Sequence, residues 1–143
     1  MNMEETAPLA IEIRGLKKSY GKKTVIKGLD LSVRLGEVFG FIGKNGVGKS
    51  TTIDCVIQAK PFEEGKISVM GHDVKEEPIL AKKEFGYCAS EPNCYDSMTG
   101  YEYLDFIASV FQVSQVDFAN NVRYLTKRLD LKEEALSRPT SGY

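Results

Sequence analysis

Hydrophobic and polar residues in the N-terminal part of the chain alternate with the period of β-strands. Residues 9–13 read LAIEI, an extended stretch continues over residues 15–20, and residues 25–27 and 29–33 repeat the alternation. Gly21 and Gly36 stand where these stretches end, as turn residues do. The pattern therefore predicts a run of short antiparallel strands between residues 9 and 36.

Shorter apolar segments follow this region. Residues 38–42 (VFGFI) predict a short buried strand, and residues 50–57 open a helix that we expect to end near Ala59, because Lys60-Pro61 follows. Residues 65–71 predict a strand between glycines, residues 78–83 a short helix, and residues 85–88 another short strand. This mixture of strands and helices indicates an α/β fold.

Two longer helices are expected in the second half of the chain. Thr99 followed by Glu102 is a capping-box pattern, which predicts a helix of about a dozen residues. A second helix is expected over residues 115–129. The apolar residues at helical spacing, which we interpret as core positions, are Leu104, Ile107, Ala108 and Phe111 in the first helix and Phe118, Val122 and Leu125 in the second.

Residues 43–51 (GKNGVGKST) fit the pattern G-x-x-x-x-G-K-[ST] of a phosphate-binding Walker A loop. A predicted strand precedes the loop and a predicted helix follows it, which is the context that the motif requires. Its glycines let backbone amides approach a phosphate, and the following helix adds its positive dipole end. The candidate nucleotide-binding residues are Gly43, Lys44, Asn45, Gly46, Val47, Gly48, Lys49, Ser50 and Thr51.

Three side chains of the loop have expected roles. Lys49 suits the β- and γ-phosphates, the Ser50 hydroxyl suits Mg²⁺, and Thr51 is placed toward the α-phosphate. For Lys44 two interpretations stay open, extra attraction for phosphate or a solvated surface lysine.

Composition narrows the class of protein. The chain has 143 residues, 42% hydrophobic and 27% charged, as expected of a single globular domain. A net charge of −1 excludes a strongly basic nucleic-acid binder, and we expect no nucleic-acid partner. Three cysteines without metal-ligand spacing suit a reduced, cytoplasmic protein. Residues 1–60 hold ten Lys/Arg against six Asp/Glu, which suits an anionic ligand, although scattered surface charge explains it equally well.

The order of these pieces resembles the nucleotide-binding domain of ATP-binding cassette (ABC) proteins. Tyr20, in the sequence KKSYG, stands where that family places an aromatic ring against adenine; the alternative is a strand residue facing the core. The stretch GLDLSV at residues 28–33, leading to GEV at 36–38, resembles the family's antiparallel arm, and GKI at 65–67 and GHD at 71–73 match its next strand and turn.

This resemblance implies a P-loop NTPase fold of the ABC type. We expect an N-terminal tail over residues 1–8 and a partial nucleotide-binding domain over 9–143. Within that domain, residues 9–36 form the antiparallel β arm, 37–90 the P-loop core and 91–143 the start of the helical subdomain.

The segment 85–99 resembles the family's Q-loop and the entry to its helical subdomain, with details closest to exporter ATPases. Ser90 aligns with the glutamine that reaches toward Mg²⁺ in the family, and Glu91 lies beside it. A serine is short, so the resemblance implies either a water between Ser90 and the metal or an inward turn of Glu91. Simple loop structure is the alternative.

The family's signature motif, Walker B aspartate, catalytic glutamate and switch histidine all lie further along than Tyr143. We therefore expect the N-terminal part of an ABC ATPase domain, truncated before Walker B, that binds ATP and Mg²⁺ with little or no hydrolysis of its own. Without the Walker B strand, Phe39, Phe41 and Ile42 would lose neighbours.

The resemblance also implies partners and a location. In the family a second nucleotide-binding domain completes the ATP site, and a transmembrane permease subunit holds the domain on the inner face of the cell membrane. Tyr95, Met98 and Tyr101 are expected to contact such a permease. The alternatives are a non-catalytic or non-transport ABC-family module and a small-molecule kinase; a kinase would lack the antiparallel arm.

Overall fold

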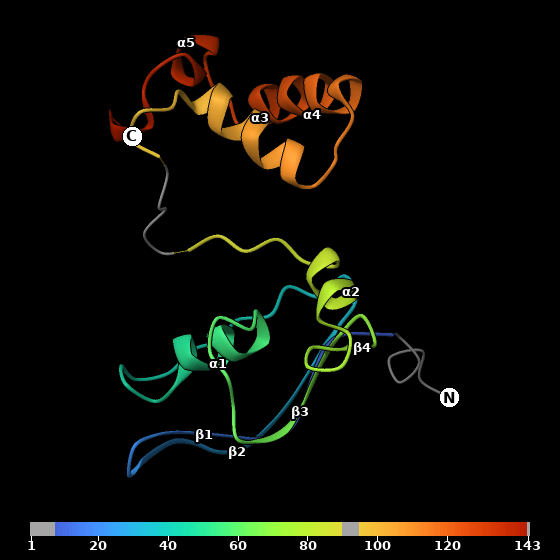
Figure 1. Ribbon diagram of the computed structural model, residues 1–143, viewed down its shortest axis with the longest axis vertical. Helices are drawn as coiled ribbons and strands as arrows, with labels where there is room; N and C mark the ends of the chain where they lie inside the picture. The colour runs from blue at the N-terminus through green and yellow to red at the C-terminus, as the bar shows by residue number, and fades with distance from the viewer. Residues whose placement is uncertain (1–7, 90–94, 143) are drawn as a thin grey trace. The chain divides into compact units, whose positions relative to one another are not determined.

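The computed structural model describes residues 8–89 and 95–142 of the chain. They form two compact units, one ending at Tyr87 and one beginning at Cys88 (Figure 1). The first unit is built on a sheet and the second is helical.

The first unit contains a four-stranded antiparallel sheet. Strands β1 (Leu9–Tyr20) and β2 (Lys23–Arg34) have 12 residues each and are joined by a two-residue turn with Gly21 at φ 57°. Strand β3 (Glu64–Val69) pairs with the other edge of β1, and the two-residue β4 (His72–Asp73) pairs with β3, giving the order β2-β1-β3-β4. The predicted antiparallel arm is present, as two long strands with irregular register.

Close contact between β1 and β3 depends on Gly65. Its φ is 99°, and a Cβ there would lie 2.7 Å from the carbonyl oxygens of Arg14 and Gly15 and from the Cα of Leu16. Any side chain would push β3 away from β1 at this point. Opposite, the Gly15 N–H donates to Asp30 Oδ1 at 2.7 Å, which ties β1 to β2 at an irregular step of their register.

The core of the first unit lies where two helices meet the sheet. Helix α1 (Lys49–Val56) and helix α2 (Pro78–Lys83) contribute Cys55 and Ala81. The other core residues are Ile13, Leu16, Ile26, Phe62, Ile67, Val69 and Val74. Burying each large apolar side chain stabilises the fold by about 1.5–3 kcal/mol. Apolar residues of β1, β2 and β3 thus form one core with Cys55 of α1.

Helix α1 ends earlier than expected. Its last residue is Val56, not Ala59, because the backbone leaves helical geometry at Gln58, where φ is 59°. Helix α2 begins and ends as predicted, with Pro78 in the first turn, where a missing N–H costs no helical hydrogen bond.

Two predicted strands do not form among the described residues. Residues 38–42 and 85–88 have no regular secondary structure; Val38 is 100% exposed and Ile42 is 94% exposed. Their apolar runs are typical of a strand buried between neighbours in a parallel sheet. No described strand pairs with either segment, so their backbone groups lack the ladder that would make them strands.

The second unit consists of helices with well-defined caps. Helix α3 (Gly100–Val110) begins with the predicted capping box: the Glu102 N–H donates to Thr99 Oγ1 at 3.2 Å, and the Thr99 N–H donates to Glu102 Oε2 at 2.8 Å. Helix α4 (Gln115–Arg128) is capped by Ser114, whose Oγ accepts from the Asp117 N–H at 3.1 Å. Both predicted helices are present: α3 has 11 residues, against about a dozen expected, and α4 ends one residue before the predicted end at Leu129.

The last described residues return to the start of α3. Helix α5 (Glu133–Leu136) and a 3₁₀ helix at Thr140–Gly142 were not expected from the sequence. The buried Thr140 donates its N–H to Met98 O and its hydroxyl to Tyr95 O, each at 2.8 Å. These two hydrogen bonds connect the last described residues to the segment before α3.

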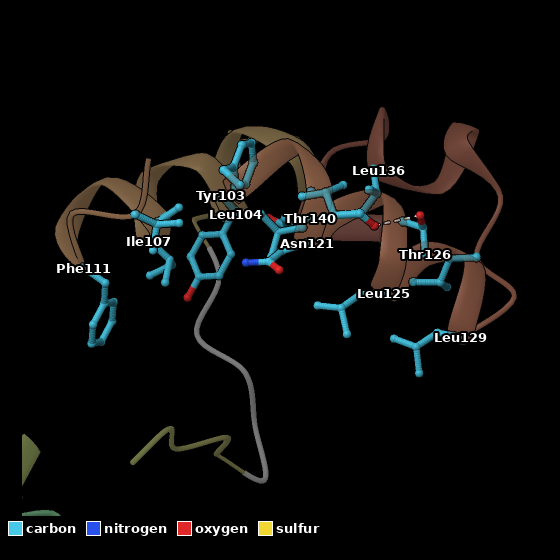
Figure 2. Close-up of a pocket in the computed structure, with 16 residues that line it drawn as sticks. Tyr103, Leu104, Ile107, Phe111, Asn121, Leu125, Thr126, Leu129, Leu136 and Thr140 are labelled. Carbon is cyan, nitrogen blue, oxygen red and sulfur yellow. Dashed lines mark hydrogen bonds between the residues drawn. The ribbon is translucent and has the colours of Figure 1, made fainter. Parts of the chain in front are cut away.

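The apolar stripe of α3 lines a cavity in this unit. A hollow of about 490 Å³ lies among α3, α4 and α5, and Leu104, Ile107 and Phe111 line it from α3 (Figure 2). Phe118 is the buried aromatic residue of α4. Its ring meets the Tyr101 ring edge-on, with the ring centroids 5.3 Å apart. Of the predicted core positions of the two helices, only Phe118 is buried. Ile107, Ala108 and Val122 are half-buried, and Leu104, Phe111 and Leu125 are exposed, so the interpretation as core positions is wrong for most of the stripe, which lines an open hollow instead. Neither α3 nor any other described helix has the length and apolar character needed to cross a membrane.

Candidate functional site

The phosphate-loop sequence forms a left-handed turn into the start of α1. Gly46 has φ 81° and Gly48, the N-cap residue, has φ 103°. These conformations are unfavourable for residues with a Cβ, which explains the two glycines. The Gly48 carbonyl accepts from the N–H and the hydroxyl of Thr52 at 2.8 and 2.9 Å. The loop therefore has a fixed connection to the first turn of the helix.

The Lys49 side chain closes the loop on itself. Its Nζ donates to the carbonyl of Gly43 at 2.6 Å and to that of Lys44 at 2.8 Å. The ammonium group is thus held at the beginning of the loop, although Lys49 itself opens α1. One side chain brings the two ends of the motif together.

Strand β2 supports the loop from behind. A Cβ on Gly48 would lie 3.2 Å from Val25 Cγ1 and 3.2 Å from Ile26 Cγ1. Gly48 is buried and Ile26 belongs to the core. Strand β2 therefore packs directly against the residue at which the loop enters α1.

The start of α1 carries the charge pattern of an anion site. The first N–H groups of a helix have no partner within it, Gly48 has no side chain to cap them, and the first turn contains no acidic residue. The helix dipole and Lys49 add positive charge at the same point. Among the described residues, this is where the geometry best suits a phosphate group.

The remaining loop residues face solvent to different degrees. Lys44, Asn45, Val47 and Ser50 are exposed and Thr51 is half-buried. The exposed Ser50 hydroxyl, for which no hydrogen bond is seen within the described residues, fits a hard cation that takes oxygen ligands and retains waters.

A cavity of about 410 Å³ adjoins the loop. Its polar lining residues are Lys49, Thr52 and, from β2, Lys27. The rest of its wall consists of Val25, Ile26, Gly28 and Leu29 of β2 together with Phe41, Ile42 and Val47. Residues predicted to lie in a buried strand thus line an open hollow beside the phosphate loop.

Tyr20 lies at the end of β1, in the same unit as the loop. The residue is 43% exposed, so it is no core residue. Two ammonium groups lie near the ring, Lys18 Nζ at 5.2 Å and Lys60 Nζ at 5.7 Å from the centroid. Lys60 also pairs with Asp54 of α1 at 2.9 Å, so Tyr20 is connected to the helix that the loop opens.

These contacts stabilise the charged form of Lys60. Asp54 first, and then Tyr20, raise the pKa of the Lys60 ammonium above its ordinary value. Nothing in the sequence pattern singled out Asp54 and Lys60, because neither belongs to a motif and Lys60 meets a ring 40 positions earlier in the chain.

The predicted metal-site residue Ser90 and its neighbour Glu91 lie outside the described residues. Their expected position near Mg²⁺ stays a prediction. The structure therefore brings together the Walker A residues, connects Tyr20 to their helix, and leaves the Q-loop role open.

The antiparallel arm, the lysine-closed glycine loop and the helix after it define a P-loop nucleotide-binding fold of the ABC type. The sequence model of the ABC transporter family matches residues 26–141. The chain belongs to this family.

Individual proteins support the assignment. The chain is 33% identical over 125 residues to the linearmycin resistance ATP-binding protein LnrL of Bacillus subtilis, covering 87% of this chain and 40% of the relative. It is 30% identical over 137 residues to the methionine import ATP-binding protein MetN of Clostridium acetobutylicum, covering 92% and 42%. A solved structure of an ATP binding subunit of an ABC transporter superposes with a TM-score of 0.85 at 28% identity, covering 94% of this chain and 55% of the other. The chain spans less than half the length of these two curated relatives.

Proposed function

We propose that this chain is the nucleotide-binding part of an ABC transporter ATP-binding subunit and that residues 43–51 bind Mg-ATP. The observation that carries the proposal is the closure of the loop by Lys49, whose Nζ lies 2.6 Å from Gly43 O and 2.8 Å from Lys44 O. The start of α1, without a capping side chain or a carboxylate, supplies amides for the same ligand. The adenine ring is assigned to Tyr20.

Binding of ATP would replace the hydrogen-bond acceptors of the Lys49 ammonium group. The ammonium group leaves two neutral carbonyls for the β- and γ-phosphate oxygens, which form stronger, charge-assisted hydrogen bonds. Amides of the loop and of the first turn of α1 orient the phosphates, and the exposed Ser50 hydroxyl offers a ligand to Mg²⁺. When bound, Mg²⁺ would neutralise phosphate charge.

We propose that the 143 residues bind ATP without turning it over. Hydrolysis needs a group that orients water at the γ-phosphate. The described wall of the cavity beside Lys49 contains no carboxylate, and neither does the first turn of α1. This favours a binding function for the chain alone, with hydrolysis assigned to a larger assembly.

Titration calorimetry with ATP in the presence of Mg²⁺ tests the binding site. Lys49→Ala is expected to weaken ATP binding at least about tenfold, since it removes a charge-assisted contact worth about 1.5–3 kcal/mol. Lys66→Ala, on the exposed face of β3, is the matched control and should bind as the unchanged chain does. Equal affinity in Lys49→Ala and the unchanged chain would overturn the proposal.

A phosphate-release assay tests the absence of turnover. We expect background phosphate from the unchanged chain with ATP. Release at the rate of an ordinary ATPase, abolished in Lys49→Ala, would contradict the binding-only part while leaving the ATP site in place.

We propose as partners a second nucleotide-binding domain and a transmembrane permease, which would place the chain on the cytoplasmic face of a membrane. Tyr95 and Tyr101 are exposed at 57% and 47%, and Met98 is half-buried beside them in the sequence. These positions are offered as permease contacts. A photocrosslinker at Tyr101 should capture the permease of the same transporter; capture at the exposed Lys66 instead would count against this surface.

A further inference from the structure

Tyr20 is held by charged groups that themselves have fixed partners. Lys18 Nζ, 5.2 Å from the ring centroid, pairs with Glu63 Oε1 at 2.9 Å. Glu63 Oε2 also accepts from the Ser19 N–H at 2.8 Å. Lys60 Nζ, 5.7 Å from the centroid, pairs with Asp54 Oδ2 at 2.9 Å. Each ammonium near the ring is therefore oriented by a carboxylate.

The Asp54–Lys60 pair connects different elements. Asp54 lies one helical turn after Ser50, on the same face of α1. Lys60 lies in the segment after α1, and Tyr20 is the last residue of β1. The contacts thus run from the ring at the end of a strand to the helix that carries the phosphate-loop hydroxyls. Tyr20 is 43% exposed and lies beside a turn, so these contacts contribute to the orientation of its ring.

We propose that Lys60, held by Asp54, is a positioning residue for the nucleobase: it fixes the Tyr20 ring relative to α1, so that base stacking and phosphate binding occur on one preorganised frame. This rests on the proposed function, because it takes Tyr20 as the adenine partner. Preorganisation of this kind raises affinity by lowering the cost of ordering the ring on binding.

Lys60 and Lys18 differ in a way that selects the residue to change. Lys18 is buried, with 7% of its surface exposed, and its replacement would leave Glu63 without its ion-pair partner. The Lys60 side chain is 47% exposed, so its replacement should not disturb the core. Lys60→Met keeps the length of the side chain and removes the charge, and Lys60→Arg restores it.

Affinities for ATP and for tripolyphosphate, both with Mg²⁺, separate positioning of the base from a general structural effect. Tripolyphosphate fills the phosphate loop without a base and cannot report on Tyr20. We expect Lys60→Met and Asp54→Asn each to weaken ATP binding by about twofold to fivefold, the size of an exposed cation–π contact, and to leave tripolyphosphate binding unchanged. Lys60→Arg should restore ATP affinity, and Lys66→Met is the matched control on the exposed face of β3.

A double-mutant comparison completes the test. In a Tyr20→Leu background, Lys60→Met should have no further effect on ATP affinity, because the ring that it positions is gone. The inference is overturned if Lys60→Met leaves ATP affinity unchanged, weakens ATP and tripolyphosphate equally, or acts fully in the Tyr20→Leu background. Failure of the proposed function gives a different result: Lys49→Ala would then leave ATP binding unchanged, or Tyr20→Leu would have no effect.

Discussion

Strand β3 and the segment 38–42 are short apolar stretches of similar length, and they differ in what lies beside them. Strand β3 pairs with β1 on one side and β4 on the other, and its Ile67 is fully buried. The segment 38–42 has no described neighbouring strand, and its Ile42 is 94% exposed. A helix satisfies its own backbone, whereas a strand is formed by the pair. Apolar character alone therefore does not make a strand.

The two units differ in the same way, because one is built mainly on paired strands and the other on helices. In the second unit, α3 and α4 begin at caps whose partners are three positions apart, Thr99 with Glu102 and Ser114 with Asp117. In the first unit, the order of β1, β2 and β3 depends on residues up to 58 positions apart, such as Ile11 and Val69. The helices are locally determined, and the strands depend on distant partners.

Hydrogen exchange offers the sharpest test of this contrast. Amides bonded across β1, β2 and β3 should exchange at least about a thousandfold more slowly than those of residues 38–42, because the former open only with the sheet. Mass spectrometry of peptides covering both regions measures this difference. Equal protection in the two regions would show that the segment 38–42 has a partner strand.

Truncation of one side chain in each region gives the next largest difference. Leu16→Ala, in a fully buried position of β1, should lower the free energy of unfolding by about 2–5 kcal/mol. Ile42→Ala should change it by less than about 0.5 kcal/mol, since that side chain is already in solvent. Urea titration of both variants measures the two values. A loss of stability in Ile42→Ala as large as in Leu16→Ala would refute the contrast.

A cap substitution tests the locally determined unit. Thr99→Ala removes the hydroxyl that accepts from Glu102 N and should cost about 1 kcal/mol of helix stability. Circular dichroism during urea unfolding is the measurement. Ser109→Ala, at an exposed position of α3, is the control and should cause no loss.

The smallest expected effect is the change in the free energy of unfolding when the pH is lowered. The N–H of Thr99, and then its hydroxyl, lower the pKa of Glu102 in the folded chain. A lowered folded pKa means that this contribution to stability is present above the unfolded value of about 4.3 and is lost as pH falls through the folded one. Urea unfolding at several pH values from about 6 to 3 should therefore show a smaller acid-induced loss in Glu102→Gln than in the unchanged chain. If Glu134→Gln, the control in α5, showed the same reduction, the cap would not be its source.

Sequence patterns predicted the parts of the structure that depend on nearby residues. The Walker A residues, the capping box at Thr99 and the antiparallel arm could all be identified, because glycine geometry, cap chemistry and period-two alternation act over a few positions. The absence of strands at 38–42 and 85–88 could not, since an apolar run looks the same whether or not a partner is beside it. The Asp54–Lys60–Tyr20 contacts were also missed, because surface charges carry no pattern that specifies their partners.

The closure of the phosphate loop by Lys49 has a consequence for which molecules can enter it. The ammonium group has two backbone acceptors, Gly43 O at 2.6 Å and Lys44 O at 2.8 Å. A ligand must compete with these two carbonyls for the Lys49 ammonium group. A neutral or singly charged ligand gains little free energy by replacing them. A chain of several phosphates offers charged oxygens that are stronger acceptors than both carbonyls. Lys49 should therefore favour ligands that carry several negative charges over ligands with one charge or none.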